Sequence, residues 1–393
     1  MNDSKSCPSK RVANHIGSLP RSGIRDFFEL VNTMDDVISL GIGEPDFVTP
    51  WRIREAAIYA LEKGCTNYTS NLGTLALRKD ICNYAAANFG VQYNPETECI
   101  VTVGVSEALD LILRAILNPG DEAIYHEPCY VSYAPSIAMT HATPVAVVTR
   151  EEENFALTAQ ALEAKITART KVILLNFPNN PTGATLSFAD KEAIARVAVD
   201  HDLLVITDKI YTELTYEDRS QSIAAFPGMP ERTVLLNGFS KAHAMTGFRL
   251  GYACGPHDLI EAMMKIHQYS MLCASSFVQA AAQEALQNGK RDRMEMRTEY
   301  EQRRNVIVKR LNDMGLPCFM PKGAFYVFPR ISQTGLSSKA FAERLLAEKR
   351  VALVPGTAFG ACGEGFVRCS YATALDEIEI SMERIAEFLQ SLK

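Results

Sequence analysis

Short apolar runs alternate with stretches of helical periodicity through the first two thirds of the chain. The β-rich runs predict strands at 100–103, 123–125, 145–148, 171–176, 203–207, 233–237 and 248–253. A helix is predicted over 106–117, because apolar residues recur there at i, i+3, i+4 and i+7, and a turn at 118–121 ends it. Strands and helices in this order are typical of an α/β fold with a mostly parallel seven-stranded sheet flanked by helices.

The pattern changes near residue 258 to long helices. A charged helix is predicted over 291–313, followed by short strands at 325–328 and 366–371 and a final helix that runs to Leu392. Because both signs of charge interleave between 290 and 310, we interpret this stretch as a solvated helix face rather than a site for an anionic partner. The C-terminal third therefore reads as a smaller α+β domain.

Composition and charge exclude several classes of protein. The 393 residues are 47% hydrophobic, and 40 Lys+Arg against 46 Asp+Glu give a net charge of −6. This composition excludes global disorder and lacks the basic footprint of nucleic-acid binding. No signal peptide or membrane-spanning stretch is visible, and the ten cysteines form neither C-x-x-C pairs nor a Cys/His cluster. We therefore expect a cytoplasmic protein with reduced thiols, no metal site, no membrane association and small-molecule partners.

Polar residues follow several of the predicted strands. In an open parallel sheet, ligands bind beyond the carboxyl ends of the strands, so these positions are candidates for a site. The residues there are Gly104, Val105 and Ser106, then Asn180, then Asp208 and Tyr211, and finally Ser240 and Lys241. Several strand ends would thus converge on one crevice.

Each candidate also has a structural interpretation. Ser106 could be a helix N-cap rather than part of an anion cup, and the turn around Asn180 could be only a turn. Asp208 could cap a helix or pair with a structural cation, although a protonated ring nitrogen would serve equally. Lys241 could lie on the surface, or it could form a Schiff base if burial lowers its pKa.

The motifs together resemble those of a known enzyme family. They are the Ser240–Tyr252 run S-K-A-H-A-M-T-G-F-R-L-G-Y, the upstream N-P-T-G at 180–183, D-K-I-Y at 208–211, and Arg368. In this order and spacing they are similar to the class I aminotransferases of fold type I, which depend on pyridoxal 5'-phosphate. The branch that they resemble most includes the aspartate and archaeal aromatic aminotransferases.

The resemblance assigns cofactor-binding roles to these residues. Lys241 would bind pyridoxal phosphate as a Schiff base and then act as catalytic base and acid at the substrate Cα. The other cofactor contacts that it implies are Asp208 on the ring nitrogen, Tyr211 and Asn180 on the ring oxygen, Tyr130 stacked on the ring, and Gly104, Val105, Ser106, Ser240 and Arg249 around the phosphate.

The resemblance also implies the substrates and the assembly. Arg368 would bind the α-carboxylate of an L-amino acid, with help from Asn180 and the backbone at Gly43. Tyr68 would reach the phosphate of the neighbouring subunit, which implies a homodimer with shared active sites. Because Arg368 must return to the crevice of Lys241, we expect a large domain at 46–288 and a small one at 1–45 plus 289–393.

Three positions depart from the family pattern. Lys209 stands where many relatives have Glu, and we expect it to point away from Asp208 and to alter a local ion pair. Gly238 stands where other branches have a phosphate-binding Ser. Glu107 stands where some aspartate-specific relatives have Lys, and it would repel a dicarboxylate if it faced the pocket.

The predicted function is transfer of an amino group from an L-amino acid, by preference an aromatic one, to a 2-oxo acid such as 2-oxoglutarate in a ping-pong exchange. Aspartate or alanine aminotransferase activity and pyridoxal-phosphate-dependent C–S lyase activity are the alternatives. A regulator with a vestigial aminotransferase domain is a third class. It would need an added DNA-binding domain, and the residues before the first motif are too few and too little basic for one.

Overall fold

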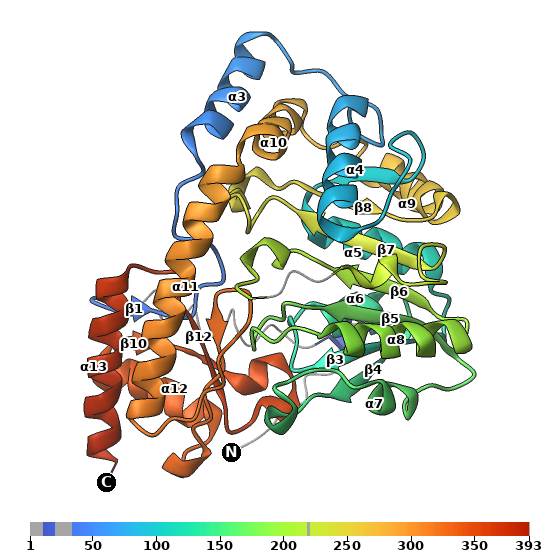
Figure 1. Ribbon diagram of the computed structural model, residues 1–393. Coiled ribbons are helices and arrows are strands. Elements are labelled where there is room, and N and C mark those ends of the chain that lie inside the picture. The colour runs from blue at the N-terminus through green and yellow to red at the C-terminus, as the bar shows by residue number, and fades with distance from the viewer. Residues whose placement is uncertain (1–10, 20–33, 218–220, 393) are drawn as a thin grey trace.

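The computed structural model describes residues 11–19, 34–217 and 221–392 (Figure 1). Cys7 and part of the segment 1–45 that was assigned to the small domain lie outside the described residues.

A seven-stranded sheet forms the larger part of the fold. Its order is β2-β8-β7-β6-β5-β3-β4, and every adjacent pair is parallel except the two that include β8. The strands are β2 (Cys99–Thr102), β3 (Glu122–Glu127), β4 (Thr143–Val148), β5 (Thr170–Asn176), β6 (Leu204–Asp208), β7 (Thr233–Gly238) and β8 (Gly251–Cys254). The predicted mostly parallel sheet is confirmed.

Alternation along the central strands supplies an apolar surface to both faces of the sheet. In β5, Val172 and Leu174 join one core cluster while Ile173 and Leu175 join another, as the two-residue period of a strand requires. The first cluster packs against α5 (Gly104–Ile116), α6 (Tyr133–Met139) and α9 (His257–Ser270), and the second against α7 (Ala159–Glu163) and α8 (Phe188–Asp200). A third joins β2, β7 and β8 to α3 (Trp51–Glu62), α4 (Leu75–Phe89) and α10 (Ser276–Asn288).

Several boundaries differ from the predicted ones by one to three residues, and two of these differences are at the starts of α5 and β8. Helix α5 begins at Gly104 rather than at Ser106, so Ser106 is not its N-cap. Strand β8 begins at Gly251 rather than at 248, because Thr246–Phe248 forms a short 3-10 turn and Arg249 has a positive φ of 51°. Both differences arise where the backbone turns toward the site described below.

The two ends of the chain meet in a second group of elements. It holds α11 (Lys290–Asp313), α12 (Ser338–Lys349), α13 (Leu375–Ser391), β1 (Ile38–Ser39), β9 (Tyr326–Val327), β10 (Val351–Ala352), β11 (Val354–Pro355) and β12 (Val367–Ser370). Strand β1 pairs in parallel with β10, so blue and orange-red segments lie side by side in Figure 1. The short helix α1 (Asn14–Gly17) contacts α6. The two-residue strands β1, β10 and β11 carry too little periodicity to be seen in the sequence.

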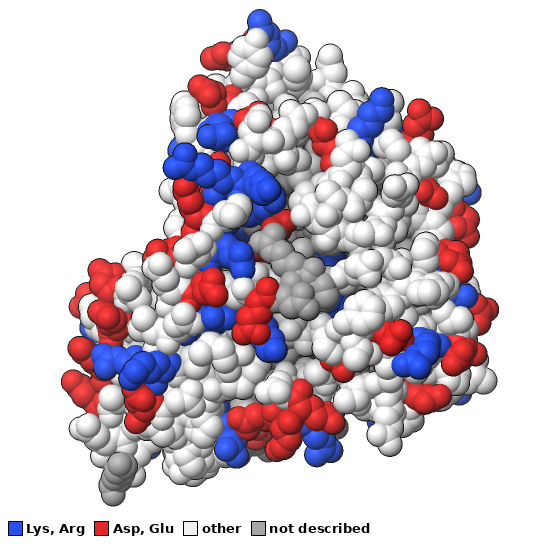
Figure 2. Space-filling model, viewed as in Figure 1, with Lys and Arg blue, Asp and Glu red and all other residues white. Residues whose placement is uncertain are grey.

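Helix α11 is only partly the solvated helix that its charges predict. One face carries exposed ion pairs four residues apart, such as Arg291 with Glu295, and both signs of charge interleave on the face of the molecule in Figure 2. However, Arg293, Arg303 and Arg304 are buried. They are tolerated because polar groups of distant segments, including the carboxylates of Glu213 and Asp46, pair with them.

Candidate active site

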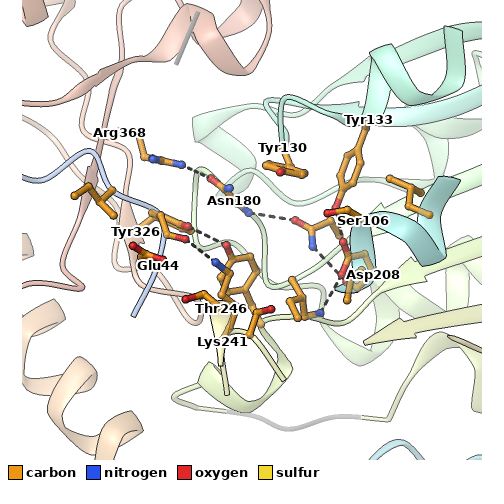
Figure 3. Close-up of a pocket in the computed structure, with 18 of the residues that line it drawn as sticks. Glu44, Ser106, Tyr130, Tyr133, Asn180, Asp208, Lys241, Thr246, Tyr326 and Arg368 are labelled. Atoms are coloured by element: carbon orange, nitrogen blue, oxygen red, sulfur yellow. Dashed lines mark hydrogen bonds between the residues drawn. The ribbon is translucent and has the colours of Figure 1, made fainter. Parts of the chain in front are cut away.

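A cavity of about 570 Å³ lies beyond the carboxyl ends of β5, β6 and β7, where the sheet faces β9 and β12 (Figure 3). All but two of the residues predicted from the sequence line it: Gly43, Val105, Ser106, Tyr130, Asn180, Asp208, Tyr211, Ser240, Lys241, Arg249 and Arg368. The two exceptions are Gly104, which lies directly beneath Arg249, and Tyr68. Segments from the whole length of the chain therefore converge at this edge of the sheet.

The last residue of β6, Asp208, lies at the floor of the cavity and is 6% exposed. Tyr133 Oη donates to its Oδ2 at 2.9 Å, and the backbone N–H of Ile210 donates to Oδ1 at 3.0 Å. Burial raises the pKa of Asp208 to about 6, since no cation of the described residues lies within ion-pair distance. A buried carboxylate with hydrogen-bond donors but no counter-charge fits a cationic ring nitrogen.

Lys241 follows β7 and reaches the same cavity from the opposite wall. Its Nζ donates to the carbonyl oxygen of Gly43 at 2.6 Å and lies 6.0 Å from the centre of the Tyr211 ring. Burial, with the nearby Arg368 and Arg249 guanidinium groups, lowers the pKa of Lys241 to about 8. A substantial fraction of this amine is thus neutral near pH 8, as a nucleophile or a base requires.

Arg368, on β12, is 3% exposed, and its guanidinium lies between the rings of Tyr326 and Phe359. It donates to Asn180 Oδ1 at 2.9 Å and to the carbonyl oxygen of Gly41 at 2.5 Å. Its Nε has no hydrogen-bond partner, and no carboxylate of the described residues pairs with it. A buried guanidinium without an anion, next to an amide, fits the carboxylate of a ligand.

The turn between β2 and α5 is built for close approach to an anion. Gly104 has a φ of +76°, and a side chain there would lie 2.7 Å from the Arg249 guanidinium. On the other side of the turn, a side chain at Gly251 would lie 2.6 Å from Val105 N. The first N–H groups of α5 have no partners within the helix, and Val105, Ser106 and Ser240 line the cavity. This cradle fits a phosphate group.

Aromatic side chains enclose the middle of the cavity. Tyr211 and Tyr326 share a hydrogen bond of 2.9 Å between their hydroxyl groups, and burial raises the pKa of both. Tyr130 forms another wall and meets Tyr133 edge to face, with ring centres 5.7 Å apart. A flat ring fits between these walls, over Asp208.

Several lining residues were not among the sequence candidates. Asn176 donates to the carbonyl oxygen of Asp208 at 3.3 Å and accepts from the backbone N–H of Asn180 at 3.3 Å, so it ties two predicted residues together. Asn176 is the last residue of β5, so the expectation that ligands bind beyond the carboxyl ends of the strands could have identified it. Tyr133 and Tyr326 come from a helix and from a separate sheet, and they carry no local signal.

Glu107 does not face the cavity. Its carboxylate accepts from the backbone N–H of Val103 at 2.5 Å and lies 2.7 Å from His267 Nδ1, behind the first turn of α5. The predicted repulsion of a dicarboxylate therefore has no basis, because Val105 and Ser106 of this turn line the cavity and Glu107 does not. Gly238 has no room for a side chain, since a Cβ there would lie 3.0 Å from both Leu250 O and Val105 Cγ2.

Tyr68 lies outside the cavity of its own chain and is 82% exposed, so its role at a neighbouring subunit stays a prediction. Lys209 does not line the cavity of Asp208. How this residue alters the local ion pairs relative to a Glu stays a prediction. No carboxylate of the described residues lies within ion-pair distance of Lys209, which borders a second, smaller cavity instead.

Metal ligands are not grouped in the described part of the chain, where no cluster of three or more His, Cys, Asp or Glu residues could hold an ion. The nine described cysteines are free thiols. A search of the described helices finds none that could span a membrane.

Known proteins share both the sequence and the fold. The family described as "Aminotransferase class I and II" matches residues 35–385. YugH of Bacillus subtilis, named as an aminotransferase without a substrate, is 50% identical over 96% of this chain and 98% of its own. An aspartate aminotransferase of Pyrococcus abyssi is 46% identical over 97% and 99% of the two chains. The crystal structure of an aromatic aminotransferase from Pyrococcus horikoshii has a TM-score of 0.89 at 47% identity, over 94% of this chain and 99% of that one.

Proposed function

Since this chain belongs to the class I and II aminotransferases, we propose that its cavity binds pyridoxal 5'-phosphate and exchanges an amino group between an L-amino acid and a 2-oxo acid. One observation carries the proposal: a buried carboxylate without a cation, Asp208, and a buried guanidinium without an anion, Arg368, lie on two sides of a single lysine amine. A cofactor with a cationic ring and a substrate with a carboxylate would satisfy both groups.

The residues of this chain would hold each part of the cofactor. Asp208 would pair with the ring nitrogen, and Tyr211 and Asn180 would donate to the ring oxygen. The turn of Gly104, Val105 and Ser106, with Ser240 and Arg249, would surround the phosphate, while Tyr130 would cover the ring. When bound, pyridoxal phosphate supplies an electron sink for the negative charge that develops at the substrate Cα.

Lys241 would form the covalent bond to the cofactor and then move the proton. Its neutral Nζ would then be free to take the proton from the substrate Cα and to hold it for its return. The lowered pKa of Lys241, about 8, keeps part of the amine unprotonated for the first transfer. Tyr133 would keep Asp208 oriented through its hydrogen bond to Oδ2.

Arg368 would bind the α-carboxylate, with Asn180 and the backbone at Gly43. We propose aromatic amino acids as preferred donors. The cations that line the described part of the cavity are Lys241, Arg249 and Arg368, and each already has a role, which leaves none for a second carboxylate. Aspartate is the alternative donor, because a similar protein has that name. The second carboxylate of 2-oxoglutarate as acceptor would need hydrogen-bonding groups or a residue of another subunit.

The working unit is proposed to be a homodimer in which Tyr68 reaches the phosphate of the neighbouring site. Its 82% exposure is compatible with this role, because the side chain is accessible to another subunit. We also propose the division into a large domain at 46–288 and a small one at 1–45 plus 289–393, with the boundary at Gly289 between α10 and α11. The free thiols support a cytoplasmic location.

The test measures the first half-reaction with a panel of amino-acid donors and then the complete reaction. L-Phenylalanine, L-tyrosine, L-aspartate and L-alanine are each mixed with the cofactor-loaded protein without an oxo acid, and the absorbance change to the amine form of the cofactor is recorded. Turnover is then measured with 2-oxoglutarate. Spectral conversion by an amino acid supports transamination, and Lys241→Ala should abolish it. Steady release of pyruvate and ammonia from a β-substituted amino acid, without conversion, would instead establish a lyase.

A further inference from the structure

A second cavity lies next to the one described above but opens elsewhere. It has a volume of about 50 Å³ and lies near the end of β6, between the end of α4 and the start of α8. Its walls are Asn88, Phe89, Phe177, Pro178, Thr185, Leu186, Lys191, Lys209, Thr212, Glu213 and Thr215. It shares no lining residue with the cavity of Lys241.

Lys209 carries a charge into this cavity without a partner. Its side chain is 8% exposed, and among residues 11–19, 34–217 and 221–392 its Nζ has neither a hydrogen bond nor an ion pair. Its one polar contact is with the face of the Phe89 ring, whose centre lies 6.0 Å from Nζ. Burial, with the charge of Lys191, lowers the pKa of Lys209 to about 7. A buried ammonium of this kind is costly unless an anion accompanies it.

The charged residues that the structure describes around Lys209 do not supply that anion. Glu213 also lines the cavity, but Arg293 binds its carboxylate at 3.1 Å and Tyr84 donates to it. Asp208 faces the larger cavity. Lys191 adds a second positive charge at this wall, where its Nζ also donates to the carbonyl oxygen of Gln221 at 3.1 Å. The ammonium form of Lys209 therefore has no counter-ion among the described residues.

We propose that Lys209 and the walls of this cavity bind a small inorganic anion of halide size. The cavity measures about 50 Å³, against about 570 Å³ for the cavity of Lys241, and one water molecule needs only about 10–15 Å³ by such a measure, so an ion of that size can enter. Thr185, with its hydroxyl, and Asn88, whose amide donates one N–H to the carbonyl oxygen of Tyr84 at 2.9 Å and has a second, also line the cavity. Asn88 is exposed, which gives the ion a route from solvent.

This site goes beyond the proposed aminotransferase activity and does not depend on it. An anion beside Lys209 would neutralise the charge that immediately follows Asp208 in the chain. Its binding would stabilise the folded protein in proportion to the anion concentration, because the unfolded chain has no such site.

The experiment is crystallography of the full-length protein in sodium bromide, with anomalous scattering to locate the ion. We expect a bromide peak within hydrogen-bond distance of Lys209 Nζ, absent in Lys209→Gln crystals. Lys339→Gln is the matched control, since its side chain is 74% exposed on α12 and it removes the same charge from the surface. A cavity without a bromide peak, or a peak that persists in Lys209→Gln, would overturn the proposal.

Thermal unfolding gives a second measurement that does not require crystals. Sodium bromide and sodium gluconate are compared at equal ionic strength, because gluconate is too large for the cavity. The wild-type protein and Lys339→Gln should gain several degrees in bromide relative to gluconate, and Lys209→Gln should gain none. Equal gains in all three proteins would contradict the site. Neither measurement uses turnover, so failure here is distinct from failure of the aminotransferase assignment.

Discussion

Replacing Asp208 by asparagine should weaken catalysis and strengthen the cofactor-free fold at the same time. The substitution keeps the shape and one oxygen, which can accept from Tyr133, but it loses the acceptor for the N–H of Ile210 and removes a charge that is buried without an ion-pair partner among the described residues. In the cofactor-free protein that charge destabilises the fold, whereas with the cofactor bound it would form an ion pair with the ring nitrogen. The two effects should therefore have opposite signs.

The size of the stabilisation follows from the pKa of Asp208. Burial raises it from near 4 to about 6, which at about 1.4 kcal/mol per pKa unit corresponds to about 3 kcal/mol. Because the folded-state pKa is the higher one, the contribution of Asp208 to the stability of the wild-type protein is most favourable below pH 4. The protein loses this amount as the pH rises from about 4 to about 6, and the loss is complete at pH 7.5. The Asp208→Asn protein lacks this pH dependence.

The size of the catalytic loss follows from the ion pair. Removing one partner of a buried charge pair costs about 3–5 kcal/mol, which equals a fall of about 10²–10⁴ in kcat/KM. Urea unfolding of cofactor-free protein at pH 7.5 and 4.5, with kinetics of the loaded enzyme, measures both effects. Asp208→Glu is the control that keeps the charge. If Asp208→Asn unfolds more easily than wild type at pH 7.5 without cofactor, or keeps wild-type kcat/KM, the reasoning fails.

Three further predictions concern the other walls of the cavity. Arg368→Gln should raise KM for the donor about 100-fold or more while cofactor affinity changes little, as fluorescence titration would show; equal losses of both affinities would contradict the assignment. Gly104→Ala should weaken cofactor binding at least 10-fold, because its Cβ would lie 2.7 Å from the Arg249 guanidinium, and a wild-type dissociation constant would disprove the cradle. Capture of pyridoxal phosphate by Lys241 should speed up with rising pH through a midpoint near 8, as the amine deprotonates; stopped-flow absorbance that places the midpoint near 10 would argue against the buried amine.

Much of the large sheet could be predicted because its strands are buried and bounded by turns. The run at 171–176 supplies apolar side chains to both faces, as a central parallel strand must, and it becomes β5, which begins one residue earlier at Thr170. Asp208 and Lys241 could be predicted as site residues because each lies at or just beyond the carboxyl end of such a strand. In contrast, β1 is two residues long and forms only by pairing with β10, so no local pattern marks it.

The parts of the site that escaped the sequence depend on long-range packing. Tyr133 reaches Asp208 from α6, and Tyr326 reaches Tyr211 across two sheets. The orientation of Glu107 could not be read from its position in the helix, because it is decided by a hydrogen bond to His267 on α9. A helix residue one position away, Ser106, faces the opposite way, and only the packed structure separates the two.

The contact of Arg368 with the carbonyl oxygen of Gly41 joins positions 327 residues apart. During synthesis, the cofactor side of the cavity, with Asp208 and Lys241, leaves the ribosome long before the strand that carries Arg368. A nascent chain can therefore build the sheet early, but it has no pocket for an amino acid until its C-terminal segment has docked beside the N-terminal one. Substrate recognition is thus among the last properties that the growing polypeptide acquires, and loss of its final segment would remove it.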